Sequence, residues 1–524
     1  MKGTGLLVRA AAVALESIRD PRQLEFALRR AVAGRIGDGT IADHLATVRS
    51  LDSWLRRFAS PPPGRVRRAI EELPCKPLFS LLGGSADSSL YDRWERIERV
   101  EDARGEFVVF LDAGARLLPH ALWLLARESE EADVLQLDAA TQFRPELDFD
   151  LLLECSSVSR GVAIRTELLR KTEGTGRLEI LLRCLALTAR VRRVPHVGLR
   201  FTAMDDAATG EGEIVARYTG LRVDAGRRAG VRRVGWPLPA EFPRVSVIVP
   251  TRDQPEVLRR CIQGLQRTDY APLELIFVDN GSKDLSALTL LRQVAEQGRA
   301  RVLREAAPFN YSALNNLGAR AATGEFLCLL NNDVEPLDPG WLKALVAHAI
   351  RPGVGAVGAR LLYPDRSVQH AGLVVGMFGT AGHLLRGARE DEPGPNGEAF
   401  ATRQVSAVTG ACLLLRRDRF LELGGLDPAL AVAFNDVDLC LRLRAAGLHV
   451  LYNPHAELLH HESKSRGGDD TVARQRRLLR EAAILQQRFR TDRFEDPAFS
   501  PNLSLRSETP ALAWPPRVPR PCPV

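Results

Sequence analysis

Residues 243–279 read PRVSVIVPTRDQPEVLRRCIQGLQRTDYAPLELIFVD, and their pattern predicts the fold class. VSVIVP and LELIFVD are continuous apolar runs rich in β-branched residues, which is typical of strands buried on both faces of a parallel sheet. The segment between them, PEVLRRCIQGLQ, has the apolar spacing of a helix. Strand, helix and strand in this order predict a βαβ unit and an α/β fold class.

Polar residues stand where each of three predicted strands ends. They are TRD at 251–253, DN at 279–280, and NNDVE at 331–335, which follows the apolar run FLCLL. Ligands of parallel sheets bind beyond the carboxyl ends of the strands, so we expect the three clusters to meet at one cleft. The alternative is that these polar residues merely terminate their strands. That alternative explains a single cluster more easily than it explains all three.

The chain also repeats itself. GEFVVFLD at 105–112 matches GEFLCLLN at 324–331, and two later matches align Gly161 with Gly410 and VPH at 194–196 with NPH at 453–455. Matches that recur in the same order along a chain are a sequence sign of a repeated structural unit. Two copies of one α/β unit are therefore predicted, with an unrelated first α/β domain as the alternative.

Length and composition fit a protein of several domains. The chain has 524 residues, of which 45% are hydrophobic, and a formal net charge of +7. This length predicts two to four domains. The segments expected are an N-terminal helical region (1–75), a first α/β domain (76–205), an Arg-rich linker helix (206–242), the main α/β domain (243–490) and a disordered Pro-rich tail (495–524).

Composition also narrows the partners and the compartment. The mild positive charge favours anionic ligands or an anionic membrane surface and does not indicate nucleic acid. The eight cysteines include no C-x-x-C pair, so we expect them to be reduced and mostly buried. No apolar stretch reaches the roughly 18–20 residues of a membrane span, and there is no clear signal peptide. We expect a cytoplasmic protein with at most a peripheral contact at the inner face of the cell membrane.

Asn331 and Asp333 offer two oxygen ligands on one side of a turn. Hard cations such as Mg²⁺ and Mn²⁺ take oxygen ligands and keep positions open for substrate phosphates. An amide oxygen binds more weakly than a carboxylate, so metal affinity should depend partly on the substrate.

Two further segments carry candidate chemistry. Asp436 lies where the helix DLCLRLRAAG begins, and it is either an N-cap or a general base that accepts a proton from a hydroxyl nucleophile. His460 and His461 follow an apolar strand and precede Lys464 and Arg466. A histidine pair beside a basic loop suits one metal ligand and cations for a diphosphate.

As a set, these residues resemble the family 2 glycosyltransferases, whose nucleotide-sugar-binding catalytic domain has the GT-A fold. The similar segments run in order over about residues 243–470: VSVIVPTRDQPEVLRRCI, VDNGS, PFNYSALNNLGARAATGEFLCLLNNDVEP, GAVGARLLYPDRSVQHAGLVVG, VTGACLLLRR, AFNDVDLCLRLRAAG and HHESKSRG. These segments resemble those of the subgroup that builds bacterial surface polysaccharides, including rhamnan and O-antigen chains.

The resemblance implies an inverting, metal-dependent transfer of a sugar from a nucleotide-diphosphate donor to a hydroxyl of a glycan or lipid-linked glycan acceptor. It implies Asp436 as the base, and a Mn²⁺ or Mg²⁺ ion held by Asn331, Asp333 and His460, with His461 the less favoured third ligand. The nucleotide-binding residues expected with it are Pro250, Thr251, Arg252, Asp253, Asp279, Asn280, Asn315 and Asn332. Weaker candidates for acceptor or diphosphate contact are Asn435, Asp438, His461, Lys464 and Arg466.

The first copy departs from this pattern. Asp112 matches Asn331, but Gly114 stands at the Asp333 position, Phe201 stands at the His460 position, and Glu179 falls near Asp436 under an approximate alignment. The first copy is therefore expected to be a degenerate GT-A-like domain without catalysis.

Two other functions stay open at this point. A sugar-1-phosphate nucleotidyltransferase would need a Gly-rich basic loop after the first strand, whereas PTRDQPEV has no glycine. The other is a non-catalytic scaffold that binds sugar nucleotides. His370 and the glycines around it fit either a mobile loop or a packed turn.

Overall fold

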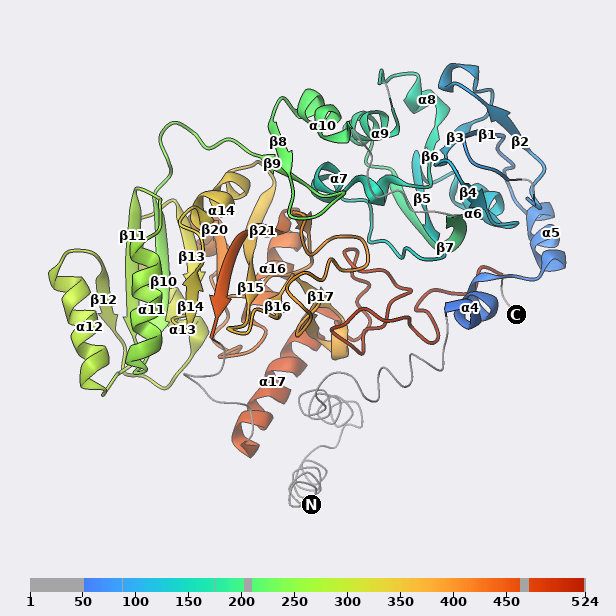
Figure 1. Cartoon of the computed structure of the whole chain (residues 1–524). Helices are drawn as coiled ribbons and strands as arrows, with labels where there is room; N and C mark the ends of the chain where they lie inside the picture. The colour runs from blue at the N-terminus through green and yellow to red at the C-terminus, as the bar shows by residue number, and fades with distance from the viewer. Residues whose placement is uncertain (1–50, 87, 175, 202–209, 462–470, 523–524) are drawn as a thin grey trace.

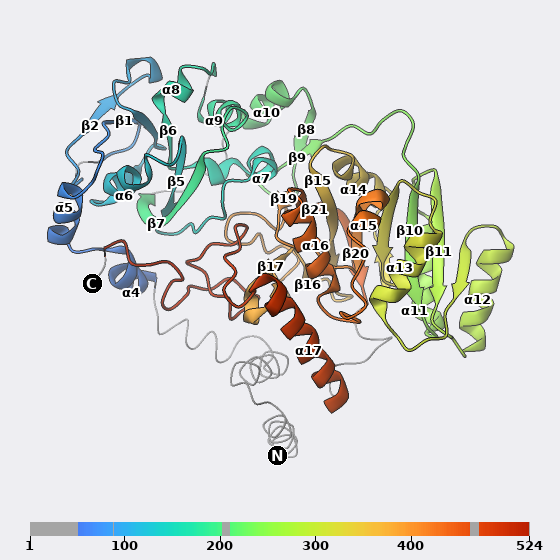
Figure 2. The same cartoon turned by 180° about the vertical axis from the view of Figure 1, so that it is seen from behind.

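The structure is a computed structural model, and it describes residues 51–86, 88–174, 176–201, 210–461 and 471–522. Two α/β units lie side by side, a smaller one built on residues 79–201 and a larger one on residues 245–460 (Figure 1). Figure 2 shows from behind that the chain after the last helix, α17 (Val472–Phe489), runs back across both units. No helix in the described ranges is long and apolar enough to cross a membrane.

The larger unit contains a mixed sheet whose first strands are the ones predicted. The order across it is β12 (Arg301–Arg304), β11 (Leu273–Asp279), β10 (Val245–Thr251), β13 (Phe326–Leu330), β20 (Cys412–Arg416), β15 (Val354–Leu362), β21 (His449–His460) and β14 (Val334–Pro336). β10, β11, β12 and β13 are parallel, β20 runs antiparallel to β13, and β21 is parallel to β15. β10 and β13 are buried along their whole length, which explains their continuous apolar sequences.

Helices cover both faces of this sheet (Figures 1 and 2). They are α11 (Pro255–Gln266), α12 (Leu285–Glu296), α13 (Tyr311–Ala321), α14 (Trp341–Ala349), α15 (Arg417–Glu422) and α16 (Asn435–Ala445). Proline opens α11 at a position where its missing N–H costs nothing. The predicted βαβ unit of residues 243–279 is confirmed. Short strands β16 (Val368–His370), β17 (Leu373–Val375), β18 (Ala381–His383) and β19 (Arg403–Gln404) fill the connection between β15 and β20.

The smaller unit has a seven-stranded sheet. Its order is β2 (Trp94–Ile97), β1 (Phe79–Leu82), β3 (Phe107–Phe110), β6 (Val162–Arg165), β5 (Val134–Ala139), β7 (Val191–Phe201) and β4 (Ala115–Leu117). Strand for strand this is the order β11, β10, β13, β20, β15, β21, β14 of the larger sheet, and every neighbouring pair has the same direction in both. This agreement supports the predicted repeat.

Matched contacts extend the agreement to side chains. The amide of Gly105 donates to Oγ of Ser80 at 2.9 Å, and the amide of Gly324 donates to Oγ of Ser246 at the same distance. At both glycines a Cβ would lie under 3 Å from that serine, so both positions require glycine.

The strand register also corrects one detail of the sequence alignment. Arg165 and Arg416 occupy the same position, since each pairs with the phenylalanine of the matched GEF run. Gly161 therefore corresponds to Cys412, two residues beyond the Gly410 predicted from the sequence, because the segments that lead into the two strands differ in length.

Helices surround the smaller sheet and precede it. They are α4 (Leu51–Trp54), a π-helical turn (Leu55–Ala59), α5 (Pro63–Glu71), α6 (Ala121–Glu128), α7 (Phe149–Glu154), α8 (Thr166–Leu169) and α9 (Arg177–Leu185). Of the predicted N-terminal helical region, residues 1–50 lie outside the described residues, and the described part contains α4, the π-helical turn and α5. The predicted linker helix is only partly right. It is α10 (Glu211–Thr219) followed by a hairpin of β8 (Arg222–Ala225) and β9 (Arg232–Gly235).

The predicted disorder of the tail is wrong for residues 495–522. Asp496 is buried and accepts hydrogen bonds from the amide of Val375 at 2.7 Å and from Oγ of Ser406 at 2.7 Å. Further along, Asn502 donates to Asp138 of the smaller unit at 2.8 Å. The tail therefore ties the two units together.

Carboxylates of α7 make a second link between the units. Asp150 pairs with Arg351 at 2.6 Å, and Glu154 pairs with His455 at 3.0 Å. Both carboxylates are buried, and a buried charge is tolerated when it is paired.

Candidate active site

The third polar cluster and the end of β21 meet beyond the carboxyl end of β13. β14 pairs antiparallel with β21, and this register sets Val334 opposite His460. As a result Nε2 of His460 lies 3.2 Å from Oδ1 of Asp333 and 3.5 Å from the side-chain amide of Asn331. The side chains of Asp333 and His460 are 6% and 7% exposed, so they are held in place but still reached by solvent.

These three side chains fit a divalent metal. A carboxylate oxygen, an amide that can present its oxygen, and an imidazole nitrogen point to one spot, and all three are ligands that Mn²⁺ or Mg²⁺ accepts. In the described part of the chain, no group of three or more His, Cys, Asp or Glu side chains is placed to hold a metal. The amide of Asn331 therefore has to complete the set, and the ion would keep positions open for phosphate oxygens.

The structure separates the two histidines. Nε2 of His461 lies 3.4 Å from Glu335, and the backbone amide of His461 donates to the carbonyl of Asp333 at 2.8 Å. His461 thus braces the turn, while His460 reaches the candidate metal ligands. This agrees with the preference for His460.

The predicted nucleotide-binding residues join the ends of β10, β11 and β13. Asn332 donates to Oγ1 of Thr251 at 3.1 Å. Oδ1 of Asp253 accepts the amides of Lys283 at 2.7 Å and Asp284 at 2.9 Å, and these bonds hold the pKa of Asp253 below its usual value.

The rest of this set shapes the same edge. Asp279 is buried, accepts the amide of Ser282 at 2.9 Å and pairs with Arg304 at 3.1 Å. Asn280 donates to two backbone carbonyls, and its Oδ1 accepts no hydrogen bond within the described chain. Such a buried acceptor is ready for a ligand donor. The remaining members are the buried Pro250 of β10, the exposed Arg252, and Asn315, which donates to the carbonyl of Tyr311.

Asp436 lies in the first turn of α16 but does not cap it. The capping position is Phe434, which makes no side-chain cap, so the N-cap alternative is wrong. Oδ2 of Asp436 accepts the amide of Gly410 at 2.8 Å, and Oδ1 accepts the amide of Val437 at 2.8 Å. Burial raises the pKa of Asp436 above its ordinary value, while these backbone hydrogen bonds counteract part of the rise.

Sequence reasoning missed Tyr311, although it lies in the quoted PFNYSALNN segment. Its hydroxyl donates to the carbonyl of Gly410 at 2.7 Å, and the amide of the same glycine donates to Asp436. A Cβ on Gly410 would lie 3.2 Å from the Tyr311 hydroxyl and 3.5 Å from Cβ of Asp436. The small residue lets the tyrosine and the aspartate approach from both sides.

Two of the weaker candidates, Asn435 and Asp438, have structural partners around α16. Asn435 donates to the carbonyls of Leu430 and Val432, which fixes the loop before α16. Asp438 is fully buried and binds Arg442 at 2.8 Å and Arg488 at 2.8 Å, so it joins α16 to α17. Lys464 and Arg466 lie outside the described residues.

His370 belongs to a packed turn. It is fully buried in β16, and its Nδ1 lies 3.0 Å from Nδ1 of His383 in β18. Burial lowers the pKa of His370 to about 3, so this ring is neutral. The mobile-loop alternative does not hold for this residue.

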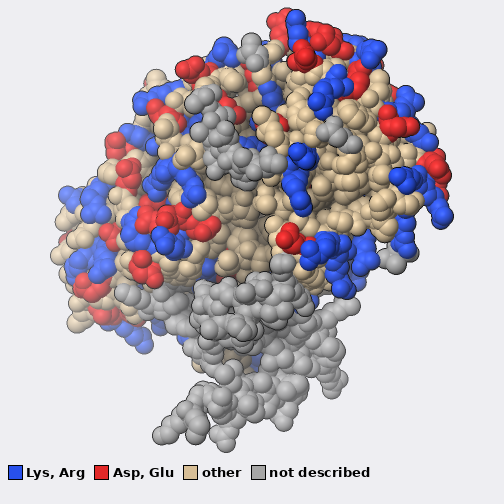
Figure 3. All heavy atoms as spheres, turned by 45° about the vertical axis from the view of Figure 1, so that its right-hand side comes forward, with Lys and Arg blue, Asp and Glu red and all other residues tan. Residues whose placement is uncertain are grey.

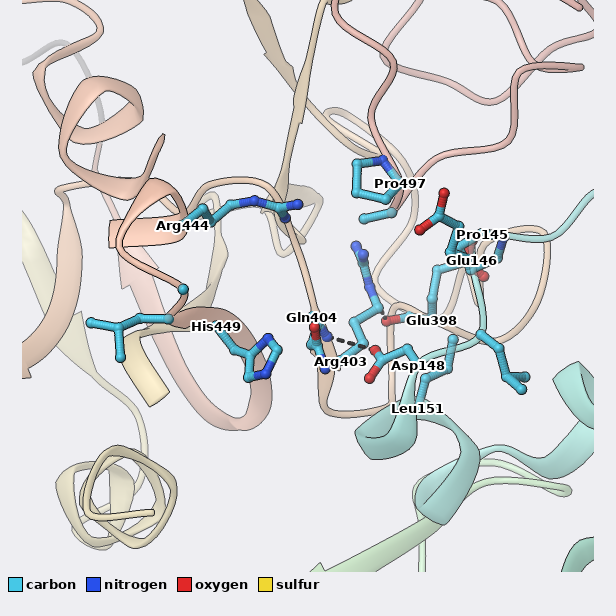
Figure 4. Close-up of a pocket in the computed structure, with 14 residues that line it drawn as sticks. Pro145, Glu146, Asp148, Leu151, Glu398, Arg403, Gln404, Arg444, His449 and Pro497 are labelled. Atoms are coloured by element: carbon cyan, nitrogen blue, oxygen red, sulfur yellow. Dashed lines mark hydrogen bonds between the residues drawn. The ribbon is translucent and has the colours of Figure 1, made fainter. Parts of the chain in front are cut away.

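A cavity of about 280 Å³ lies at the junction of the two units and the tail, and none of the predicted site residues lines it. Figure 4 shows Asp148 and Glu146 of the smaller unit facing Arg403, Gln404 and His449 of the larger one. On the face drawn in Figure 3, acidic and basic residues are interspersed.

Comparison with known proteins bears on the family to which the chain belongs. The profile of the family described as Glycosyl transferase family 2 matches residues 246–424. The chain is 38% identical to the uncharacterized protein y4gI of Sinorhizobium fredii and 36% identical to the O-antigen biosynthesis protein RfbC of Myxococcus xanthus. These alignments cover 91% and 70% of the chain, but only 55% and 32% of the relatives, so the chain spans about half and a third of their lengths.

A shorter relative is covered more completely. The chain is 30% identical to the N-acetylglucosaminyl-diphospho-decaprenol L-rhamnosyltransferase of Mycobacterium tuberculosis, over 40% of this chain and 74% of that protein. A solved mannosyltransferase from Pyrobaculum calidifontis, in complex with GDP-Man and Mn²⁺, is 19% identical with a TM-score of 0.36, over 48% of this chain and 68% of that one.

The expected α/β fold of the GT-A type is confirmed for the larger unit, whose sheet carries the matched residues. The reading of the smaller unit as a degenerate copy stays a prediction. Residues 246–424 match the family model, and the chain covers 74% of a relative to which it is 30% identical. The chain belongs to glycosyl transferase family 2.

Proposed function

We propose that this chain is an inverting glycosyltransferase that moves a sugar from a nucleotide-diphosphate donor to a hydroxyl of a glycan or lipid-linked glycan. Asp436 is the general base of this reaction. Asn331, Asp333 and His460 hold a Mn²⁺ or Mg²⁺ ion, and the residues at the ends of β10 and β11 bind the nucleotide.

One observation carries the proposal: consecutive residues connect the base to the metal ligands. Asp436 accepts the amide of Gly410 at 2.8 Å, and the carbonyl of the next residue, Ala411, accepts the amide of Asn331 at 3.0 Å. The Asp436 carboxylate and the cluster of metal ligands are thereby both held by the segment that leads into β20. This is the arrangement needed to act on one sugar from two sides.

The reaction follows from these positions. The acceptor hydroxyl gives its proton to the Asp436 carboxylate as its oxygen attacks the anomeric carbon. The bond from that carbon to the diphosphate breaks, and its electron pair leaves with the diphosphate. A bound divalent ion would supply the positive charge that stabilises this leaving group. A single displacement inverts the configuration at the anomeric carbon.

The biological setting is proposed from the relatives. One is named for O-antigen biosynthesis, and another for rhamnosyl transfer to a decaprenyl diphosphate-linked sugar. We therefore place the reaction in bacterial surface polysaccharide synthesis, on the cytoplasmic side, with a lipid-linked glycan acceptor. The matched order of the two sheets supports a degenerate GT-A-like first unit.

The test is a product assay with nucleotide sugars and Mn²⁺, using lipid-linked acceptors, on wild type and Asp436→Asn. Removing a general base should lower the rate about 10²–10⁴-fold while leaving donor binding in place. Asp418→Asn, an exposed aspartate on α15, is the matched control. Full activity of Asp436→Asn would refute the base, and donor binding without any transfer would favour the scaffold alternative.

A further inference from the structure

The strand ends of the smaller unit carry different side chains from the matching strand ends of the larger unit. By strand register, Asp112 stands at the position of Asn331, and Ser159 lies in the turn that leads into β6, as Gly410 lies in the turn that leads into β20. Arg177, the first residue of α9, reaches both: its guanidinium pairs with Asp112, and its Nε donates to Oγ of Ser159 at 3.2 Å. One guanidinium thus bridges the end of β3 and the turn that leads into β6.

A second arginine, Arg160, lies against the residue that takes the place of the histidine ligand. Register matches Phe201 with His460, since each pairs with the first residue of the short strand opposite. The guanidinium of Arg160 lies 5.7 Å from the ring centre of Phe201, and its Nε is 3.7 Å from Oδ2 of Asp112. A guanidinium over an aromatic face is stabilised by cation–π attraction.

Glu179, which the approximate sequence alignment sets near Asp436, pairs with two other arginines. It is buried, and its carboxylate binds Arg183 at 2.9 Å and Arg217 at 3.0 Å. The residue of α9 that pairs with Asp112 is Arg177.

Positive charge exceeds negative charge at this cluster. The guanidiniums of Arg160 and Arg177 both face the one carboxylate of Asp112. A third guanidinium, that of the fully buried Arg144, binds Oε1 of Gln142 at 2.9 Å and the carbonyl of Leu137 at 2.7 Å. Burial lowers the pKa of Arg144 to about 10, and repulsion from the other two arginines contributes. An additional anion would relieve this repulsion.

Solvent reaches the front of the cluster. The side chains of Asp112, Arg177 and Arg160 are 30%, 19% and 10% exposed. They are therefore partly desolvated, which strengthens charge-assisted hydrogen bonds, yet they remain open to a ligand.

We propose that the smaller unit binds a phosphate-bearing ligand, a phosphate ester or diphosphate, through Arg160 and Arg177 and without a metal ion. Guanidinium forks match phosphate oxygens and keep their charge at every physiological pH. The ligand displaces Asp112 from part of its contact with Arg177. The chemistry fits two sources, a nucleoside diphosphate and a lipid diphosphate such as carries a growing glycan. At this cluster the start of α9 presents Arg177 rather than a carboxylate, so the cluster binds the ligand and does not transfer a sugar.

The test is calorimetric titration of the full chain carrying Asp333→Ala, in EDTA, which disables the metal cluster of the larger unit. The probes are inorganic pyrophosphate, UDP and GDP, and geranyl diphosphate as a soluble lipid diphosphate. We expect pyrophosphate to bind at one site per chain, with at least tenfold weaker binding when Arg177→Gln is added. Preference for the nucleotides or for geranyl diphosphate then identifies the source.

Two variants make the outcome decisive. Arg160→Gln leaves the Arg177–Asp112 pair intact and keeps the test valid if Arg177→Gln fails to fold. Arg217→Gln removes an arginine that binds Glu179 rather than Asp112 and should leave affinity unchanged. No binding of any probe in EDTA, or equal affinity in the Arg160→Gln and Arg217→Gln variants, overturns the proposal. Neither result touches the metal-dependent site, which is measured separately on wild type with Mn²⁺.

Discussion

The hydroxyl of Tyr311 donates a 2.7 Å hydrogen bond to the carbonyl of Gly410, and the amide of Gly410 binds Asp436. Tyr311 thus acts on the candidate base through the backbone of one glycine. Tyr311→Phe removes this bond and keeps the ring. We expect kcat to fall about tenfold with little change in donor KM, because orientation of the base is lost while the donor site is intact.

Steady-state kinetics of Tyr311→Phe beside Tyr363→Phe check this. Tyr363 has its hydroxyl bound by Arg386 at 2.8 Å, outside the base and metal cluster. A shifted pH profile of kcat in Tyr311→Phe alone would mark a positioning role. Equal effects of the two substitutions would contradict it.

The pH dependence of the reaction should reflect the raised pKa of Asp436. A base must be deprotonated to act, and burial holds the proton of Asp436 to a higher pH than an ordinary aspartate would. The rate should therefore decline, as pH falls, at a pH above the usual value of about 3.9. Measuring kcat over pH 4–9 tests this, and a profile that stays flat across that range argues against Asp436 as the base.

The two histidines should differ in their effect on metal binding. His460 lies 3.2 Å from Asp333, whereas His461 lies 3.4 Å from Glu335. His460→Ala should weaken Mn²⁺ binding, measured with saturating nucleotide, by more than about 100-fold. His461→Ala should weaken it less, by the roughly 10–100-fold that the loss of a residue supporting a metal ligand costs. The reverse order would reassign the third ligand to His461.

The free energy of unfolding should depend on the protonation of Asp148, which faces the cavity between the two units (Figure 4). Burial, and then the charge of Asp150, raise the pKa of Asp148 to about 7, although the amides of Gln404 and Asp150 bind its carboxylate. The folded chain therefore holds a proton that the unfolded chain releases near its ordinary pKa. This contribution to the free energy of unfolding must fall as pH rises from about 4 to 7.

Asp148→Asn removes that titration. Urea unfolding at pH 5 and pH 8 should show a larger loss of stability in wild type than in the variant. Asp365→Asn, at an exposed turn where hydrogen bonds lower the pKa, is the control. The same pH dependence in Asp148→Asn and wild type would rule out Asp148 as its source.

Much of the fold could be predicted because its signals are local. β10 and β11 have continuous apolar sequences, and the matched GEF runs revealed the repeat. The tail could not be predicted in this way. Its many prolines suggest disorder, but Phe499 and Leu503 find buried positions only between two units that are distant in sequence.

The candidate site, too, could be predicted only where its signals are local in the sequence. Asn331, Asp333 and His460 were predicted from strand ends and a histidine pair, and the structure brings them together. Tyr311 was missed because its partner is 99 residues away, in a turn whose approach no local pattern encodes. Asp438 was overestimated, because the sequence does not reveal that Arg488 of α17 neutralises it.

The most direct test of the central claim is binding of nucleoside diphosphates to wild type and Asp333→Ala, measured as the rise in melting temperature with and without Mn²⁺. A ligand that binds only the folded state stabilises it by RT ln(1 + [L]/Kd). We expect one nucleotide series of UDP, GDP or dTDP to stabilise wild type only with Mn²⁺, and we expect Asp333→Ala to lose this effect. An equal shift in Asp333→Ala, or no shift in wild type with any series, would contradict the central claim.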